Sequence, residues 1–446
     1  VAMASRLGAY LCLGAVWHIA ALGEDSEEVA LLQRSVSVLR AKPIQWSQGK
    51  AAQRAPGGCR SAAAIVAAMR QGGSSYAAQL RGCLEVGSCT ASSSKADQDA
   101  AAAAGAVDAV VAAMQRFPDD KPIQLSCAMA VSGLILFNRE NGLRAGQLGG
   151  LNTTLAFYRS HMDDPVVTSL GGAIGAYFDF VNENRAIARE LGGIQLFIQN
   201  IRNNFHGRYS NWAYEPVKQS LFALSSGTWK NQDVAYNESF IPLSVQLMME
   251  HGDETKIAEE TLQAVKALVR YSDDFRREYS DTGIFEALVR VLNENPRDRG
   301  AISLACEGAM HLVGPTVMAD MNGVLRGIPF DANIQARATR AGMVEALVAT
   351  AMSGEERQHF EHGAFNFDVD AAYPADANCF SALHTMAYNN PANRAAMLQE
   401  GLPESAAKKL QAGALELSAK AAACTLLAQL GQPNSACLNL QQQVAA

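Results

Sequence analysis

Residues 382–401 read ALHTMAYNNPANRAAMLQEG. An apolar segment at the start of this stretch ends at the polar turn Asn389-Asn-Pro391, and a second segment runs from that turn to Gly401. Apolar residues three and four positions apart indicate helices, while Asn, Pro and Gly mark the places where helices begin and end. The stretch therefore predicts two amphipathic helices joined by a tight turn.

A glycine followed by an apolar residue begins a helical segment at intervals along the chain. These starts are Gly105-Ala-Val107, Gly149-Gly-Leu151, Gly192-Gly-Ile194, Gly283-Ile284, Gly342-Met343 and Gly401-Leu402, with a weaker start at Phe240-Ile241. Their apolar residues are 44, 43, 47, 43, 59 and 59 positions apart. A helical pattern with a basal period near 43 residues predicts a stack of repeats, in which each unit buries its core against its neighbours and leaves one long surface free.

The stretch quoted above resembles the armadillo repeat. The family's Ala-Leu pair, Asn-x-x-Asn-Arg segment and closing apolar-x-x-Gly match residues 382–401 nearly end to end, and related Asn segments recur at residues 141–144 and 182–185. The resemblance covers residues 60–434 and identifies a class of repeat, not one protein. It implies an all-α, right-handed superhelical armadillo/HEAT-like solenoid of about seven three-helix units. The third helix of each unit would line a concave groove that binds a protein or peptide, so we expect a non-catalytic scaffold or adaptor.

Differences in composition divide the chain into five parts. They are a signal peptide at residues 1–23, a flexible pro-segment or second targeting region at 24–59, a divergent N-terminal cap repeat at 60–104, the armadillo-like array at 105–434 and a C-terminal tail at 435–446. Insertions at residues 203–216, 314–334 and 354–376 interrupt the period of the array. Insertions in repeat proteins form surface loops, often beside the binding face.

The N-terminal residues have the three parts of a secretory signal. Met3-Ala-Ser-Arg6 is short and basic, residues 7–21 are apolar, and the small residues Ala21 and Gly23 follow. The apolar run is short for a membrane span. We therefore expect a cleaved signal and a protein of the secretory pathway, extracellular or in an organelle reached through it. The alternative is a cytoplasmic armadillo adaptor whose apolar N-terminus is an uncleaved cap or membrane anchor.

The charge balance argues against two classes of partner, nucleic acids and anionic membranes. The chain has 37 Lys and Arg against 44 Asp and Glu, a formal net charge of -7, and no long run of basic residues. Nucleic acids and anionic membranes attract proteins of the opposite charge. We expect no nucleic-acid binding and, once the signal is removed, no contact with a membrane.

Four of the nine cysteines occupy one equivalent position in the long helix of their repeats: Cys127, Cys306, Cys379 and Cys424. Cysteine fills small packing sites well, so we expect free thiols there. The other cysteines leave alternatives open. Cys83 with Cys89, Cys59 with either of them, and Cys424 with Cys437 could each form a disulfide, and the sequence alone does not give the connectivity.

The groove positions of the family can be located in each repeat. In armadillo proteins that carry nuclear-import cargo, a third helix presents a Trp and, four residues later, an Asn. No repeat here has that pair, so an import receptor is disfavoured. Small residues, among them Gly133, Gly172 and Gly308, would let a partner approach closely. The binding candidates in the groove are Met129, Phe222, Ser226, Gln263, Leu312, Ser381, Thr385 and Leu426. They suit an apolar helix in a groove, unless they pack into adjacent repeats.

Two of the insertions carry aromatic residues that are candidates for binding: Tyr209, Trp212, Phe365 and Phe367. Exposed aromatic side chains need a partner that buries them. The alternative is that each loop folds back over a neighbouring repeat.

Residues 354–376 also hold the one cluster with metal-ligand residue types, His359 and His362 with Asp368 and Asp370. The cluster lacks the ligand set and the general-base glutamate of zinc motifs, so we expect a solvated acidic loop without a metal or another cofactor. No nucleophile elbow, phosphate-binding loop or dinucleotide motif occurs. We therefore expect no enzyme, with a metal-dependent enzyme at this loop as the alternative.

Two Asn-x-Ser/Thr triplets are acceptors for N-linked glycans by sequence, Asn152-Thr-Thr154 and Asn237-Glu-Ser239. Such triplets also arise by chance in a chain of this length, so they support secretion only weakly.

Overall fold

The computed structural model describes residues 61–90, 95–136, 138–168, 170–178, 181–204, 217, 219–221, 223–224, 231–269, 272–314, 316–319, 325–353, 375–413 and 415–437. The expected signal peptide, the segment at 24–59 and most of the insertions at 203–216 and 354–376 lie outside this part of the chain. The described residues form two compact units. The first runs to Leu243 and includes Gln263–Leu268, and the second comprises Ser244–Leu262 and the residues from Val269 onwards.

The first unit begins with two helices, α3 (Ala62–Gly72) and α4 (Tyr76–Thr90). The helices that follow are α5 (Lys95–Ala103), α6 (Ala106–Arg116) and α7 (Lys121–Ile135); α8 (Arg139–Gln147), α9 (Gly150–Ser160), α10 (Pro165–Thr168) and α11 (Gly171–Phe178); α12 (Asn182–Glu190) and α13 (Gly193–Asn204); and α15 (Gln232–Asn237). A repeat thus has a short first helix, a second helix and a third helix, which in one case is divided into α10 and α11.

The same order continues through the remaining helices. They are α16 (Phe240–His251) and α17 (Thr255–Val269); α18 (Asp273–Thr282), α19 (Ile284–Glu294) and α20 (Arg299–Val313); α21 (Ala332–Arg340), α22 (Met343–Met352) and α24 (Ala375–Ala387); and α25 (Pro391–Gln399), α26 (Leu402–Gln411) and α27 (Leu417–Gln429). None of the described helices is long and apolar enough to cross a membrane.

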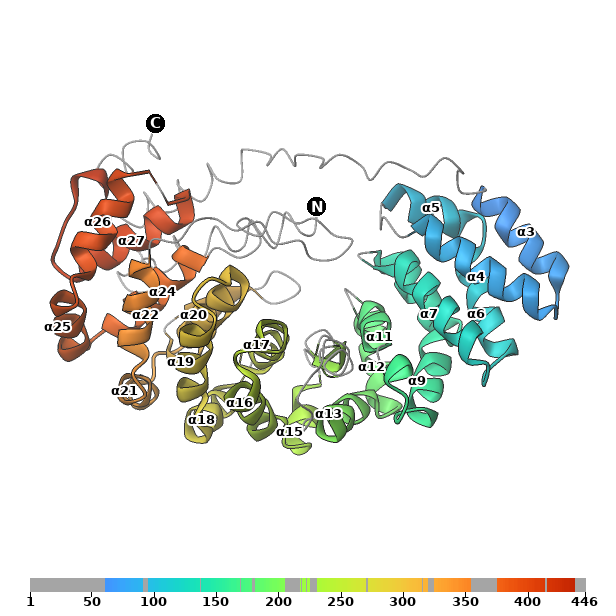
Figure 1. The fold of residues 1–446 in the computed structure, drawn as a ribbon, viewed down its shortest axis with the longest axis horizontal. Coiled ribbons are helices and arrows are strands. Elements are labelled where there is room, and N and C mark those ends of the chain that lie inside the picture. Colours follow the sequence, from blue (N-terminus) through green and yellow to red (C-terminus); the bar gives the residue numbers. More distant parts are fainter. Residues whose placement is uncertain are drawn as a thin grey trace. The chain divides into compact units, whose positions relative to one another are not determined.

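Helices of the same rank lie next to one another within each unit. In the first unit, the third helix α7 packs between α4 and α11, and the second helix α6 packs between α3 and α9. In the second unit, α24 packs between α20 and α27, and α22 packs between α19 and α26 (Figure 1). The prediction of an all-α array of three-helix repeats is therefore confirmed.

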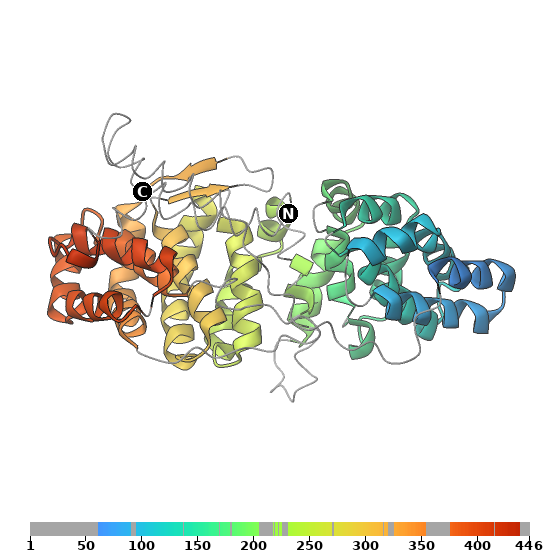
Figure 2. The same ribbon diagram turned by 90° about the horizontal axis from the view of Figure 1, so that it is seen from above.

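One insertion contains a short β-hairpin, which the sequence analysis did not predict. Strand β1 (Thr316–Ala319) pairs antiparallel with β2 (Leu325–Ile328), so that Thr316 lies opposite Ile328 (Figure 2). The hairpin occupies the expected surface insertion at 314–334, between the third helix α20 and the first helix α21. A run of only four residues per strand gives little periodicity to detect.

The glycine that precedes most second helices is explained by backbone geometry. The φ angles of Gly105, Gly149, Gly283, Gly342 and Gly401 are 87°, 81°, 94°, 83° and 74°. This left-handed region is unfavourable for residues with a Cβ atom, so glycine is preferred there. Ser239 takes the same region, with φ 55°, directly before α16. The weaker start at Phe240 therefore has the geometry of the others without their glycine.

Buried asparagines on the first helices join each repeat to the one before it. Asn184 is fully buried, and its Nδ2 donates to the carbonyl of Tyr177 at 2.8 Å and to that of Gly142 at 2.9 Å. Asn141 and Asn393 likewise donate to the carbonyl seven residues earlier. Carbonyls at the ends of helices have no partner within the helix, and these amides satisfy them. The Asn segments that resemble the armadillo repeat thus bind the end of one repeat to the next.

Aromatic side chains fill the core around α9, α11 and α13. The rings of Tyr158 and Phe178 both meet Phe197 edge to face, with centroids 5.7 and 6.4 Å apart. All three side chains are buried. Full burial of an aromatic or large aliphatic side chain contributes about 1.5–3 kcal/mol each. This core packs the second helices α9 and α13 against the third helix α11.

Candidate functional site

Two disulfide bonds join third helices of neighbouring repeats, and a third joins the last of these helices to the chain that follows it. Cys83 on α4 is bonded to Cys127 on α7, Cys306 on α20 to Cys379 on α24, and Cys424 on α27 to Cys437. The Cα atoms of these pairs are 4.8, 4.8 and 5.5 Å apart. Cys89 is disulfide-bonded as well. Every cysteine in the described ranges is therefore oxidised.

The expectation of free thiols in the packing position of the repeat is wrong. Cys306 and Cys379 were both assigned to that position, and they are bonded to each other because equivalent positions of adjacent third helices face one another. The same holds for Cys127 and its partner Cys83. Of the pairings that the sequence left open, Cys424 with Cys437 is confirmed, whereas Cys83 with Cys89 does not form.

The helices α4 and α7 run in the same direction and lie very close together. Cys83 is bonded to Cys127, and seven residues further along α4 Thr90 lies against Gly133 of α7. A Cβ atom on Gly133 would be 2.6 Å from the Thr90 Oγ1, which is closer than real contacts allow. Gly133 therefore accommodates the neighbouring helix.

Other small residues of the predicted groove also face neighbouring helices. A Cβ atom on Gly172 would be 2.1 Å from the Gln219 Oε1, and one on Gly308 would be 3.6 Å from Leu288. Gly172 therefore permits close packing between repeats, and the prediction that it leaves room for a ligand is wrong. A Cβ atom on Gly308 would make only an ordinary contact, with α19 of the same repeat, but Gly308 is itself buried and does not line an open groove.

Two large apolar side chains of α4 and α7 are nevertheless more than half exposed. Leu84 is 56% exposed and Met129 is 62% exposed. Leu84 directly follows Cys83, and Met129 comes two residues after Cys127. Because these two cysteines are bonded, Leu84 and Met129 lie at nearly the same level along the parallel helices. Val86 and Val131, on the opposite sides of these helices, are 1% and 0% exposed. Leu84 and Met129 are thus exposed on the sides of α4 and α7 opposite these buried valines, and we call the two side chains the Leu84–Met129 surface.

Met129 was among the candidates from the sequence, whereas Leu84 was missed. Residues 60–104 were interpreted as a divergent cap, so their third helix was not aligned with the others. One signal was present, because Cys83 precedes Cys127 by 44 residues, which is one step of the repeat. Aligning the two cysteines identifies residues 76–90 as a third helix, but it places Leu84 opposite the buried Ala128, so the exposure of Leu84 is visible only in the structure.

The structure places three of the other groove candidates in the core. The side chains of Leu312, Thr385 and Leu426 are each 0% exposed, so their assignment to a ligand-binding surface is wrong. On these helices the fourth residue after the Trp-equivalent position (Leu312 and Thr385), or that position itself (Leu426), is turned into the core. Gln263 and Ser381 are partly exposed and keep a side chain available at the surface.

The remaining candidates lie outside the described residues. They are Phe222 and Ser226 in the groove, Tyr209, Trp212, Phe365 and Phe367 in the loops, and the cluster of His359, His362, Asp368 and Asp370. Within the described ranges, no group of three or more His, Cys, Asp or Glu side chains is arranged to hold a metal ion.

The helix α20 carries charged residues on a buried surface. Every residue from Gly300 to Val313 is buried, and the His311 Nε2 lies 3.2 Å from the Glu307 Oε1. Glu259 on α17 reaches the start of this helix, where a Cβ atom on Gly300 would be 1.8 Å from its Oε1. Burial raises the pKa of Glu259, although the ammonium of Lys256, 2.8 Å away, opposes the shift. The two ion pairs each lie within one helix, and only the approach of Glu259 to Gly300 joins α17 to α20; none of these contacts offers an open site.

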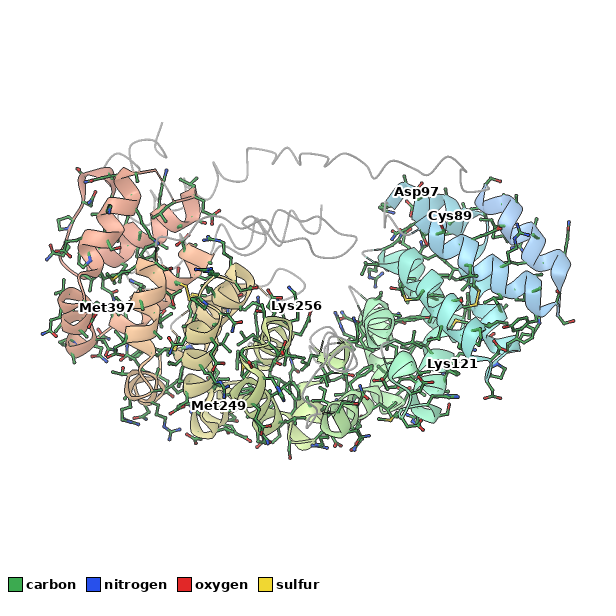
Figure 3. The ribbon with its side chains drawn as sticks, in the orientation of Figure 1. Cys89, Asp97, Lys121, Met249, Lys256 and Met397 are labelled. Carbon is green, nitrogen blue, oxygen red and sulfur yellow. A yellow bond between two sulfur atoms is a disulfide. The ribbon has the colours of Figure 1, made fainter. Side chains whose placement is uncertain are left out.

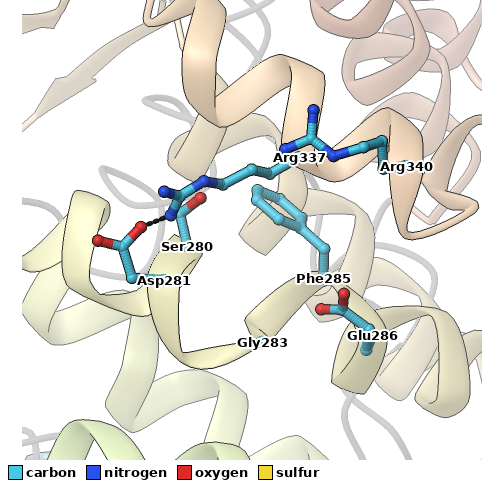
Figure 4. Close-up of a pocket in the computed structure, with 7 residues that line it drawn as sticks. All are labelled: Ser280, Asp281, Gly283, Phe285, Glu286, Arg337 and Arg340. Atoms are coloured by element: carbon cyan, nitrogen blue, oxygen red, sulfur yellow. Dashed lines mark ion pairs between the residues drawn. The ribbon is translucent and has the colours of Figure 1, made fainter.

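A shallow hollow lies between α18, α19 and α21. It has a volume of about 240 Å³ and is lined by Ser280, Asp281, Gly283, Phe285, Glu286, Arg337 and Arg340 (Figure 4). Arg337 forms an ion pair with Asp281. Because two arginines and two carboxylates line it, the hollow has no net charge with which to attract an ion. Its volume is also below the 300–1,000 Å³ or so of typical ligand pockets.

The comparisons with known proteins concern the fold. The sequence matches no protein-family description and no curated protein. An engineered protein solved by the Northeast Structural Genomics Consortium is similar in structure, with a TM-score of 0.63 and 15% identity over 98% of this chain and 92% of that one. A designed armadillo repeat protein matches with a TM-score of 0.46 and 13% identity, over 63% of this chain and 99% of that one.

A computationally designed armadillo repeat protein for modular peptide recognition also matches, with a TM-score of 0.43 and 14% identity over 55% of this chain and 98% of that one. At these identities the likeness concerns the fold alone. In its three-helix repeats and in the packing of helices of equal rank, this chain is an all-α protein that resembles armadillo repeat solenoids.

Proposed function

We propose that this protein is a non-catalytic scaffold that binds a peptide or protein segment through the third-helix face of its N-terminal repeats. The observation that carries the proposal is the Leu84–Met129 surface. Its two large apolar side chains are more than half exposed on helices that a disulfide holds together. Exposed apolar groups on a rigid support are typical of protein-binding surfaces.

Covering this surface would supply part of the free energy of binding. Full burial of a Leu or Met side chain contributes about 1.5–3 kcal/mol, so covering the exposed part of Leu84 and Met129 would contribute roughly 1–2 kcal/mol each. The disulfide between Cys83 and Cys127 fixes the spacing of the two helices before a ligand arrives. A preformed surface loses little conformational entropy on binding. We expect the ligand to present an apolar side chain to this surface.

The compartment that we propose is the secretory pathway, outside the cell or in an organelle reached through it. All seven cysteines within the described ranges are disulfide-bonded: Cys83, Cys89, Cys127, Cys306, Cys379, Cys424 and Cys437. Disulfides persist in oxidising compartments and are rare in the cytosol. This pattern supports the secretory pathway that the N-terminal residues predict, over the cytoplasmic alternative. Alkylation of thiols before and after reduction, in protein taken from its own cells, tests it directly.

Selection from a displayed peptide library tests the binding proposal. The full chain is immobilised, binding peptides are selected, and their affinities are measured for the wild type and for Met129→Glu. The matched control is Met249→Glu, because Met249 is 38% exposed on the second helix α16, away from any third helix (Figure 3).

We expect Met129→Glu to weaken binding by about tenfold or more, since about 1.4 kcal/mol corresponds to a factor of ten, and Met249→Glu to leave it unchanged. Selection of no specific peptide, or equal weakening by the two variants, would contradict the proposal.

A further inference from the structure

The two glycosylation triplets of the sequence differ sharply in their structural setting. Asn237 is the last residue of α15 and is exposed, and Ser239 two residues later is exposed as well. The side chain of Asn237 makes no hydrogen bond with other described residues. An acceptor asparagine is expected in a surface turn or loop. The triplet of Asn237 meets that requirement.

The backbone of this triplet forms a turn that contacts the neighbouring helix α13 through its middle residue, Glu238. Ser239 has a φ of 55°, and its N–H donates to the carbonyl of Tyr236 at 2.9 Å. Arg202 on α13 donates to the carbonyl of Glu238, and its guanidinium lies 3.8 Å from the carboxylate of that residue. The middle residue thus binds the neighbouring helix, while Asn237 and Ser239 point their side chains into solvent. A sugar attached to Asn237 would displace no hydrogen bond of its side chain with the described part of the chain.

The triplet of Asn152 has the opposite setting. Asn152 is exposed but lies in the first turn of α9, and Thr154 is only 1% exposed. The Thr154 Oγ1 donates to the carbonyl of Gly150 at 2.9 Å. The hydroxyl that the triplet needs is therefore enclosed in the folded chain. Of the two triplets, only the one at Asn237 presents both of its essential side chains.

We propose that Asn237 carries an N-linked glycan. The inference rests on the proposed secretory compartment, whose lumen holds the donor, a lipid-linked oligosaccharide pyrophosphate. In the transfer, the Asn237 Nδ2 forms a bond with the anomeric carbon of the first sugar, and the bond between that carbon and the pyrophosphate oxygen breaks. The lipid pyrophosphate leaves, and the amide gives up one proton to a base. Oxidation states do not change.

The position of the glycan is compatible with the proposed binding site. Asn237 ends a first helix, and α15 packs beside the second helix α13 (Figure 1). The Leu84–Met129 surface lies on third helices several repeats earlier in the chain. The glycan therefore makes this part of the protein surface hydrophilic without entering the third-helix face of α4 and α7.

Enzymatic deglycosylation of the full chain tests the inference. The chain with its own N-terminus is produced in cells that have a secretory pathway, treated with peptide-N-glycosidase F and examined by gel mobility and intact mass. We expect the wild type to lose one glycan. Asn237→Gln and Ser239→Ala are each expected to abolish the shift, and the matched control Asn152→Gln to retain it.

Each contrary result has a distinct meaning. A protein with formed disulfides but no glycan would overturn the assignment of Asn237 and leave the compartment and the binding proposal standing. A shift that is lost in Asn152→Gln and kept in Asn237→Gln would overturn the choice between the triplets. A protein without a glycan and with reduced cysteines would overturn the inference together with the proposed compartment, whereas the peptide selection would still report on binding.

Discussion

The disulfide between α20 and α24 is expected to be the strongest single constraint on the C-terminal repeats. Cys306 and Cys379 are buried and 73 residues apart, and the loop that they close contains the hairpin, α21 and α22. In the chain-entropy model, cross-linking a loop of this length destabilises the unfolded chain by about 4.4 kcal/mol at 25 °C. The corresponding value for Cys424 and Cys437, which are 13 residues apart, is about 2.9 kcal/mol. The double variant Cys306→Ala with Cys379→Ala should therefore lose more stability than the pair at 424 and 437.

Native-state hydrogen exchange is the appropriate assay, because repeat proteins unfold in parts and a single midpoint can hide a local change. A loss of about 4.4 kcal/mol corresponds to a decrease in protection of roughly a thousandfold, since about 1.4 kcal/mol is a factor of ten. We expect this decrease for the amides of α20 and α24. The control is Cys424→Ala with Cys437→Ala, where α27 should lose about tenfold less. If the shorter loop proves equally or more important, the entropic reasoning is refuted and the bonds stabilise by contacts in the folded state.

Three further predictions concern side chains between the repeats. Asn184→Ala removes both hydrogen bonds of a fully buried amide and should lower the free energy of unfolding by about 2–4 kcal/mol, measured by urea denaturation. Gly171→Ala should destabilise by roughly 1–3 kcal/mol, because its Cβ would lie 2.6 Å from the carbonyl oxygen of Gln219. By contrast, Gly87→Ala, whose Cβ meets its nearest neighbour at 3.6 Å, should stabilise α4, and thermal melting of the two variants distinguishes them. Burial raises the pKa of Glu259 above its usual 4.5. The protonated side chain therefore contributes its full stability below pH 4.5, and this stability is lost as the pH rises through the raised pKa. Glu259→Gln should remove this pH-dependent loss, and equal dependence of stability on pH in the two proteins would exclude the effect.

The architecture could be predicted from the sequence because it depends on local chemistry. The left-handed glycines such as Gly283 and Gly342 mark where second helices begin, and their spacing gives the repeat. The Asn segments could be recognised for the same reason, since Asn184 and Asn393 act within one or two neighbouring helices.

The candidate site was harder to predict, since exposure depends on contacts between repeats. One residue of register separates an exposed position such as Met129 from a buried one such as Ala130, and periodicity alone does not fix register to that accuracy. The glycine at 172 is another example: its role becomes visible only when Gln219 of the next repeat is placed against it. Disulfide pairing likewise requires knowing which cysteine positions of adjacent repeats face each other.

The central claim is that the third-helix face of α4 and α7 binds a peptide or protein segment. Hydrogen–deuterium exchange of the full chain with and without a selected peptide tests it most directly, because it locates the contact without a substitution. We predict slower exchange in α4 and α7 when the peptide is present, and unchanged exchange in the second helices α9 and α13. Protection confined to the second helices, or no protection of α4 and α7 at saturating peptide, would contradict the account.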